Sequence, residues 1–242
     1  MRATTLLATI LAFAFNLLAQ PKRPVEEFKT TAGTLKITAI RHASLMIEAG
    51  GQVIHVDPYS QGNYEGLSAA DVILITDIHG DHMDPKAIDK VRKPGTTVIA
   101  PKAVVEKGVE GTVLNNGETN TLGKWTIEAI PMYNLTRGPA AGKLFHDKGR
   151  GNGYVVTYGG KRFYIAGDTE GIPEMRGLKN IDVAFIPMNL PYTMTPEEAA
   201  DAVRAFAPKV VYPYHYQKSD VNAFKAALAN TQIDVRLIDW YY

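Results

Sequence analysis

The sequence predicts an α/β protein in which two mixed β-sheets are sandwiched between helices. In the N-terminal half, short apolar runs pair as hairpins, and Ser44 to Ala49 joins Gln52 to Val56 through Gly50-Gly51. Farther along the chain, buried apolar strands alternate with helical segments. Hairpins followed by alternating strands and helices are typical of sheets that combine antiparallel and parallel pairs.

Length and composition favour one globular domain. The chain has 242 residues, of which 45% are hydrophobic, so it can bury a substantial core. Its 26 basic and 25 acidic residues leave a net charge of +1, which gives no bulk attraction to nucleic acid or membrane surfaces. It has no cysteine, which excludes disulfides and thiolate metal ligands. We therefore expect a small-molecule substrate and no nucleic-acid partner, while composition carries no signal for the oligomeric state.

Residues 1–20 are typical of a secretory signal peptide. Arg2 provides a small positive region, and the apolar run from Leu6 to Ala19 is short for a membrane span. We expect an exported protein, periplasmic or secreted, without a stable membrane anchor; an uncleaved N-terminal anchor is the alternative. Residues 21–32 are expected to be a linker that leads to a single domain at residues 33–242.

The first half of this domain is expected to contain mainly short strands. No linker or repeat interrupts it. Besides the hairpin, the expected elements are strands at Leu35 to Ile40, Val72 to Ile75, Thr97 to Ala100 and Lys124 to Ile130, with two short helices between Pro85 and Lys107. The segment from Pro131 to Asn152 is long for an irregular connection, and such loops are often functional.

The second half repeats this pattern and ends in strands that alternate with helices. Thr195-Pro196-Glu197-Glu198 is a capping box with proline at the first helical position. Ser219 is expected to cap a final helix. The expected strands are Gly153 to Tyr158, Arg162 to Ala166, Val183 to Pro187, Val210 to Pro213 and Val235 to Ile238.

The strongest functional signal follows the buried run Val72 to Ile75. Four potential metal ligands, Asp77, His79, Asp81 and His82, stand within six residues. Polar side chains at the carboxyl end of a buried strand mark the place where open α/β sheets build their sites. Imidazole and carboxylate together suit zinc and other borderline divalent metals. A solvated loop rich in aspartate and histidine is the alternative, and chance rarely produces this density of ligands.

These residues resemble the signature of the metallo-β-lactamase superfamily, T-H-x-H-x-D-H after a strand. The sequence Thr76-Asp77-Ile78-His79-Gly80-Asp81-His82 follows it except that Asp77 replaces the first histidine. The resemblance implies an αββα sandwich over residues 33–242, in which Gly167-Asp168-Thr169 supplies a metal-bridging aspartate and His215 a further ligand. The superfamily's remaining histidine has no counterpart after Ile130, and we expect His146, in the long loop, to replace it.

The resemblance further implies two metal sites bridged by Asp168. Asp77, His79 and His146 would form the first site, and Asp81, His82 and His215 the second. Without cysteine, the set is similar to the all-histidine and aspartate hydrolases of the lactonase-like and phosphodiesterase-like branch. That implies a metal-dependent hydrolase, in which a metal-bound hydroxide cleaves an ester, lactone or phosphodiester bond, with zinc as the expected metal and manganese or iron as options.

Several further residues are candidates for roles around these sites. His42, in a His-Ala-Ser stretch similar to that of the same branch, is a candidate catalytic residue together with Asp81, and Asp57 could orient a ligand histidine. Basic residues in the long loop, such as Arg137, Lys143 and Lys148, hint at an anionic substrate. The candidate substrate-pocket residues are Tyr133, Asn134, Arg150, Asn152 and Tyr192.

Three other interpretations remain open at this level. The enzyme could be mononuclear if Asp77 turns away from the first site. The fold could carry a non-catalytic metal- or ligand-binding protein. A diiron oxidoreductase is the third option, although members of that kind carry glutamate where His79 stands here.

Overall fold

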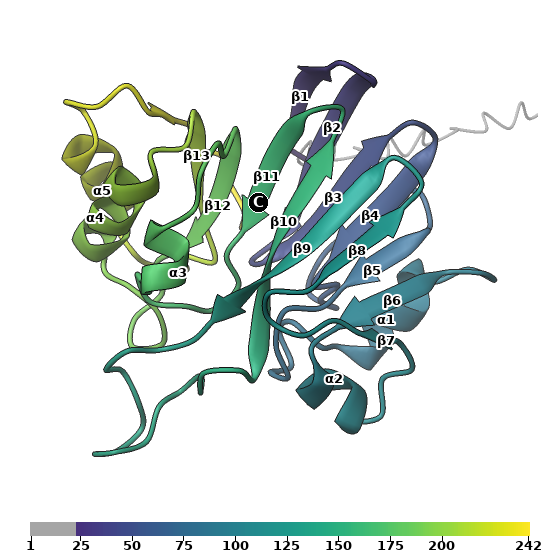
Figure 1. The fold of residues 1–242 in the computed structure, drawn as a ribbon, viewed down its shortest axis with the longest axis horizontal. Coiled ribbons are helices and arrows are strands. Elements are labelled where there is room, and N and C mark those ends of the chain that lie inside the picture. The colour runs from purple at the N-terminus through teal and green to yellow at the C-terminus, as the bar shows by residue number, and fades with distance from the viewer. Residues whose placement is uncertain (1–22) are drawn as a thin grey trace, which may run out of the picture.

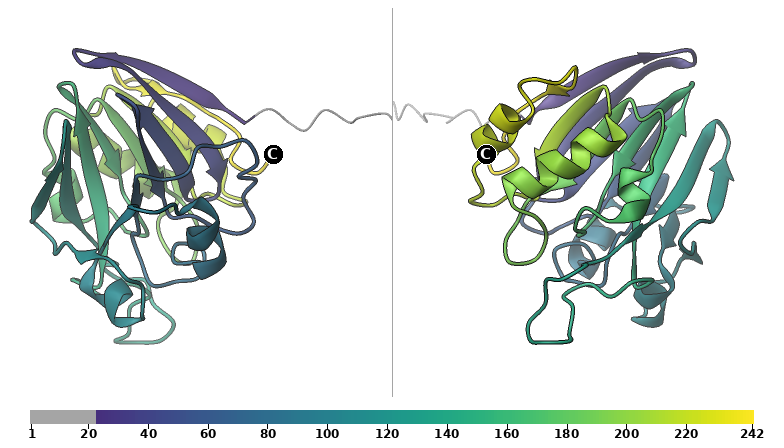
Figure 2. Two further views of the ribbon diagram at one scale, coloured as in Figure 1. Left: turned by 90° about the vertical axis from the view of Figure 1, so that its right-hand side faces the viewer. Right: turned by 60° about the vertical axis from the view of Figure 1, so that its left-hand side comes forward.

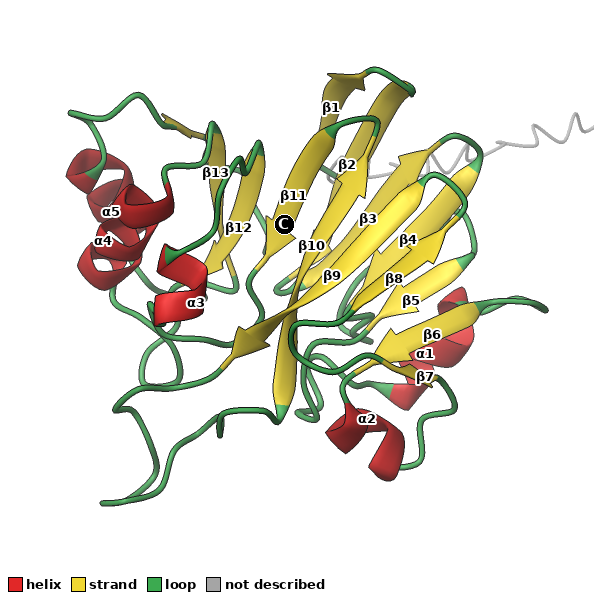
Figure 3. Cartoon of the chain, in the orientation of Figure 1, coloured by secondary structure: helices red, strands yellow, loops and turns green. Residues whose placement is uncertain are grey.

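Two seven-stranded sheets face each other across the core of residues 23–242, the part of the chain that the computed structural model describes (Figure 1). The strand order is β1-β2-β3-β4-β5-β6-β7 in the first sheet and β14-β13-β12-β11-β10-β9-β8 in the second. Each sheet therefore contains strands from one half of the chain only. Strands make up most of the ordered structure, and the helices are short (Figure 3).

The first sheet begins as an antiparallel meander and continues with parallel strands. Strands β1 to β4 pair antiparallel, and β4 to β7 pair parallel. Helices α1 (Pro85–Val91) and α2 (Lys102–Glu106) connect the parallel strands. The strands are β1 (Val25–Thr30), β2 (Gly33–Arg41), β3 (Ser44–Ala49), β4 (Gln52–Val56), β5 (Val72–Leu74), β6 (Thr97–Ala100) and β7 (Thr112–Val113).

The second sheet repeats this change from antiparallel to parallel pairing. Strands β8 to β11 pair antiparallel, and β11 to β14 pair parallel. Helices α3 (Pro173–Arg176), α4 (Pro196–Phe206) and α5 (Val221–Ala227) belong to this half. The strands are β8 (Thr119–Leu122), β9 (Trp125–Met132), β10 (Gly151–Tyr158), β11 (Lys161–Ile165), β12 (Val183–Pro187), β13 (Val210–Tyr214) and β14 (Asp234–Val235).

Alternating side chains divide the core into three apolar layers. In β10, Val156 faces the inner layer between the sheets, while Val155 faces the outer layer beneath α3, α4 and α5. A third layer, which includes Ile73 and Ile88, lies between the first sheet and helices α1 and α2. Figure 2 shows the helices of the C-terminal half lying over the outer face of the second sheet. The predicted αββα sandwich is thus confirmed.

The predicted linker at residues 21–32 is wrong in part, because β1 lies within it. Strand β1 is the edge of the first sheet and pairs along its whole length with β2. Among its residues only Phe28 is buried, whereas Val25 is 47% exposed. An edge strand with charged outward side chains lacks the apolar run that identifies a buried strand.

The predicted signal peptide at residues 1–20 lies outside the described residues, so it stays a prediction. Within residues 23–242, no helix has the length and apolarity that crossing a membrane requires.

Two predicted boundaries near the C-terminus also change. Helix α5 is capped by Asp220, whose carboxylate accepts hydrogen bonds from Asn222 and Ala223, and not by Ser219. The strand predicted at Val235 to Ile238 pairs only over Asp234–Val235. The capping box at Thr195 is confirmed, with Glu198 as its reciprocal partner.

The last residues of the chain are anchored in the core. Trp240 is fully buried, with its ring centroid 5.8 Å from that of Tyr214 and 6.0 Å from that of Phe185. Its carbonyl oxygen accepts a hydrogen bond from the backbone N–H of His42 at 3.3 Å. The C-terminal segment therefore fixes the turn between β2 and β3.

We expect Trp240→Ala to lower the free energy of unfolding by about 3–5 kcal/mol, since it removes a large buried ring and leaves a cavity. Urea denaturation of the metal-free protein measures this difference. Val25→Ala, at an exposed edge position, should change stability by no more than about 0.5 kcal/mol. Equal losses for the two variants would contradict the anchoring role of Trp240.

Candidate metal centre

All seven predicted metal ligands converge where the carboxyl ends of strands from both sheets meet. Asp77, His79, Asp81 and His82 come from the loop after β5. Asp168 follows β11, His215 follows β13, and His146 comes from the connection between β9 and β10. Their donor atoms fall into three groups, Asp77 with His79 and His146, His82 with Asp168 and His215, and Asp81 with His215 and His42, and within each group the atoms lie within 4.8 Å of one another. The structure therefore brings the seven predicted ligands together at one place.

The predicted second site has the spacing of a metal-binding site. His215 Nε2 lies 3.3 Å from Asp81 Oδ2 and 3.2 Å from Asp168 Oδ1. His82 Nε2 lies 3.4 Å from Asp168 Oδ2 and 3.8 Å from Asp81 Oδ2. Donor atoms that bind one tetrahedral ion at about 2.1 Å are themselves roughly 3.4 Å apart. The four side chains could hold one ion with little adjustment.

The predicted first site has similar spacing but includes Asp77, which stands where the superfamily signature has a histidine. Asp77 Oδ2 lies 2.9 Å from His79 Nδ1 and 4.0 Å from His146 Nε2. His146 Nε2 also lies 3.3 Å from Asp168 Oδ2. The Asp168 carboxylate thus faces both groups, as a bridging ligand must.

Unpaired nitrogen atoms support a metal at this place. His82 Nε2, His146 Nε2 and His215 Nε2 are buried and have no hydrogen-bond partner within residues 23–242. A buried polar atom without a partner costs about 1–3 kcal/mol. Because all three atoms point to the same place, a divalent cation would satisfy them together. The residues therefore fit the metal that their chemistry implies.

A buried carboxylate holds His82 in its ligand orientation, as predicted for Asp57. Asp57 Oδ2 accepts a hydrogen bond from His82 Nδ1 at 2.8 Å, which leaves Nε2 to the metal. Thr76 donates to the same carboxylate from its backbone N–H at 2.8 Å and from its hydroxyl at 2.6 Å. Such outer contacts fix the tautomer and the ring orientation of a ligand histidine.

Asn134, a predicted substrate-pocket residue, supports His146 in the same way. Asn134 Oδ1 lies 2.7 Å from His146 Nδ1 and accepts the backbone N–H of His146 at 2.8 Å. Its amide nitrogen donates to the carbonyl of Tyr192 at 2.8 Å and to Glu170 at 3.1 Å. The side chain is buried behind the ligand, so it positions His146 and does not face a substrate.

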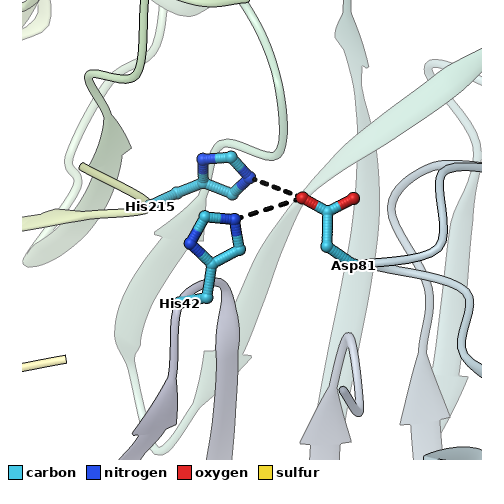
Figure 4. A group of neighbouring side chains, drawn as sticks. All are labelled: His42, Asp81 and His215. Carbon is cyan, nitrogen blue, oxygen red and sulfur yellow. Dashed lines mark hydrogen bonds and ion pairs between the residues drawn. The ribbon is translucent and has the colours of Figure 1, made fainter. Parts of the chain in front are cut away.

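His42 lies against both Asp81 and His215 (Figure 4). Its Nε2 lies 3.1 Å from Asp81 Oδ2, and its ring centroid is 3.7 Å from that of His215. Its Nδ1 lies 2.7 Å from the hydroxyl of Tyr241, which accepts the backbone N–H of Gln217 at 2.8 Å. The Tyr241 hydroxyl therefore donates to Nδ1, and Nε2 of the neutral ring donates to Asp81.

Tyr241 was not among the residues predicted for the site. No motif surrounds it, and it lies 199 residues from its partner His42.

Arg150 forms a bidentate ion pair with Asp77. Its Nε donates to Asp77 Oδ1 at 3.0 Å and its Nη2 to Asp77 Oδ2 at 2.9 Å. Burial alone would raise the pKa of Asp77, but His79, His82 and Arg150 lower it to about 2. Arg150 also donates to the carbonyl of Phe145 at 2.8 Å. Arg150, which was predicted to contact substrate, is therefore engaged with a candidate ligand.

Two adjoining cavities open onto the ligands. Asp81 and Gln217 line both of them. A cavity of about 330 Å³, the metal cavity, contains most of the ligands and is lined by His79, Asp81, Phe145, His146, Asp168, Asn189, Tyr192, His215 and Gln217. A cavity of about 600 Å³, the side cavity, is lined by Arg41, His42, Tyr59, Gln61, Gly80, Asp81, Gln217 and Tyr241.

Of the five predicted pocket residues, Tyr192 alone lines these two cavities. Tyr133 donates its hydroxyl to Glu174 at 2.9 Å. Asn152 is buried and donates to the carbonyl of Leu114 at 2.7 Å. Neither side chain lines the metal cavity or the side cavity, and each makes a hydrogen bond within the fold.

Comparison with known proteins gives a consistent picture. A family model described as beta-lactamase superfamily domain matches residues 36–215. A UPF0173 metal-dependent hydrolase of Thermococcus kodakarensis is 32% identical over 197 residues, covering 75% of this chain and 84% of the relative. Its counterpart in Thermus thermophilus is 31% identical over 191 residues, with the same coverage.

Solved structures show the same fold. A Parabacteroides distasonis protein, provisionally named a metal-dependent hydrolase, is 47% identical with a TM-score of 0.86, covering 91% of this chain and all of that one. The metallo hydrolase Igni18 from Ignicoccus hospitalis is 26% identical with a TM-score of 0.71, covering 86% of this chain and 96% of that one.

The Asn134–His146 and Asp57–His82 contacts should each support a different metal site. We expect Asn134→Ala to weaken zinc binding at the first site by about 10- to 100-fold, because His146 loses its orientation. Asp57→Asn should weaken the second site by a similar factor. Calorimetric zinc titrations measure the affinities of the first and the second site in each variant. Each variant thereby serves as the control for the other. Loss at the same site in both variants would contradict the assignment.

The Asp77–Arg150 pair should behave as a unit. Asp77→His alone leaves the half-buried Arg150 cation without its carboxylate, beside an imidazole and the metal site, so we expect weaker zinc binding at the first site. Asp77→His combined with Arg150→Met should bind zinc at least about 10-fold more tightly than Asp77→His alone. Competition with a chromophoric chelator measures these affinities. Equal zinc affinity in the single and double variants would show that the two residues are not coupled.

Proposed function

Because the chain belongs to the β-lactamase superfamily and is a metal-dependent hydrolase of that fold, we propose that it cleaves an ester, lactone or phosphodiester bond in a small molecule. The observation that carries this proposal is a set of three buried imidazole nitrogens that face the Asp168 carboxylate and have no hydrogen-bond partner within residues 23–242. His146 and His215 of that set, together with Asp168, line the metal cavity, which a substrate can enter.

We propose zinc as the metal. The donors are imidazole nitrogens and carboxylate oxygens, a combination that zinc accepts and that manganese and iron also tolerate. When bound, such ions lower the pKa of a water molecule from 15.7 toward about 7 and polarise the oxygen atom of the scissile bond. Asp77 supplies a harder donor than the histidine it replaces, which widens the range of metals that the first site can hold.

The chain's own residues would guide the proton. Asp81 lines both cavities, and its Oδ2 faces His42 and His215. It would accept a proton from the attacking water at that carboxylate and return it to the leaving group. His42, fixed by Tyr241, keeps the carboxylate turned toward the cavity. His42 therefore positions Asp81.

The two sites contribute differently to this proposal. Asp81, His82, His215 and Asp168 provide a complete set for one ion by themselves. The first site depends on Asp77, whose carboxylate is shared with Arg150. We propose two ions, and an enzyme with a single ion in the second site would carry out the same class of reaction.

We expect His82→Ala and His215→Ala each to remove the second-site metal and nearly all hydrolytic activity, because a catalytic site has few protein ligands. Elemental analysis gives the metal content, and assays with p-nitrophenyl esters, a lactone and bis-p-nitrophenyl phosphate give the activity. His55→Gln is a matched control. His55 is buried but bonds to the carbonyl of Ser68, so this variant should keep both metal and activity.

Chelation followed by zinc return should abolish and restore activity in the wild-type protein. Full metal content in either ligand variant would refute the second-site assignment. Metal binding without turnover of any of these bond classes would favour a non-catalytic binding protein.

A further inference from the structure

The side cavity contains a guanidinium group that no residue neutralises. Arg41 stands at the end of β2, directly before His42, and lines the cavity. Its guanidinium makes neither a hydrogen bond nor an ion pair with any residue of the described range 23–242. The carboxylate on the cavity wall, Asp81, already faces His42 and His215. The Arg41 charge is therefore available to a ligand.

An aromatic ring holds this guanidinium in place. The Arg41 Cζ atom lies 5.2 Å from the centroid of the Tyr241 ring, a distance typical of a cation–π contact. The Tyr241 hydroxyl is itself fixed by His42 and by the backbone of Gln217. A ring accepts none of the N–H groups as a carboxylate would, so the guanidinium can still bind an oxyanion with two parallel hydrogen bonds.

The other cations near the centre are already paired. Arg137 forms an ion pair with Glu198 at 2.7 Å, and Lys148 forms one with Glu174 at 2.8 Å. Arg150 is bound to Asp77. Lys143 is exposed and lines neither the metal cavity nor the side cavity. The basic residues of the long loop, Arg137, Lys143, Lys148 and Arg150, therefore line neither of the two cavities.

We propose that Arg41 binds an anionic group of the substrate, a carboxylate or a phosphate, at a distance from the bond that is cleaved. This proposal rests on the proposed function, because it places the scissile bond in the metal cavity and the anionic arm in the side cavity. Asp81 and Gln217 belong to both walls, so one molecule can extend across them. A volume of about 600 Å³ accommodates an arm of several carbon atoms.

Tyr59 adds a second polar contact in the side cavity. Its hydroxyl makes no hydrogen bond with residues 23–242, and the ring lies 6.2 Å from that of His42. A hydroxyl donor beside a guanidinium suits an oxyanion. The substrate class is thus an ester, lactone or phosphodiester that also carries a negatively charged group away from the bond that is cleaved.

Binding measurements on the zinc-loaded protein test this subsite without any turnover. Glutarate offers one carboxylate to the metals and one to Arg41, whereas glutarate monoamide offers only one carboxylate. We expect the wild type to bind glutarate about 10- to 100-fold more tightly, since charge-assisted bidentate pairs are strong. Arg41→Met should bring the two dissociation constants together, and Arg41→Lys should restore part of the difference. Replacing glutarate with 4-phosphonobutyrate shows which oxyanion is preferred.

Lys143→Met is the matched control, since it removes the same charge from the loop without touching either cavity. It should leave the preference for glutarate unchanged. An unchanged preference in Arg41→Met, or an equal loss in Lys143→Met, would overturn the proposal.

Kinetics separate this proposal from the proposed function. In Arg41→Met, we expect KM for mono-p-nitrophenyl glutarate to rise about 10- to 100-fold, with little change for neutral p-nitrophenyl butyrate. Arg41-dependent glutarate binding without hydrolysis of either ester would support the subsite and refute the ester activity. If the wild type and Arg41→Met hydrolyse mono-p-nitrophenyl glutarate equally efficiently, the activity would be supported and the subsite refuted.

Discussion

The buried carboxylate of Asp168 is the group on which the rest of the centre depends. It lies within 3.4 Å of His82, His146 and His215, which come from three different connections. Burial by itself would raise the pKa of Asp168, but His215, His82 and His146 lower it well below its usual range. Because this buried charge is poorly solvated, its position requires positive charge nearby, which a metal ion held by these residues would supply.

The backbone around Asp168 leaves little freedom. Gly167 has φ +66°, and a Cβ atom there would lie 2.5 Å from Met132 Sδ. Its N–H donates to the Tyr214 hydroxyl at 2.8 Å, which links the turn after β11 to β13. His42 and His215 also have positive φ values of 58° and 48°. Such strain in residues with side chains is characteristic of functional sites, and here the backbone N–H of His215 donates to the carbonyl of His42 at 3.1 Å.

Local patterns in the sequence were sufficient for most of the fold and for the metal ligands. The Gly50-Gly51 hairpin, the capping box at Thr195 and the ligands after β5 each depend on neighbours in the chain. The edge strand β1 was missed because its outward face is charged. The partners that support the site could not be predicted, because Arg150 is 73 residues from Asp77 and Tyr241 is 199 residues from His42. Such contacts depend on how the sheets pack, which no local pattern encodes.

The replacement of a ligand histidine by Asp77 makes physical sense only together with Arg150. A carboxylate adds a negative charge to a buried site, whereas a neutral imidazole adds none. The guanidinium cancels this charge, so the Asp77–Arg150 pair is electrically equivalent to the imidazole that it replaces. The pair also couples the site to the long loop, because Arg150 binds the carbonyl of Phe145, the residue before His146. The loop that provides His146 is therefore held by the same Asp77–Arg150 ion pair that balances the charge of the aspartate.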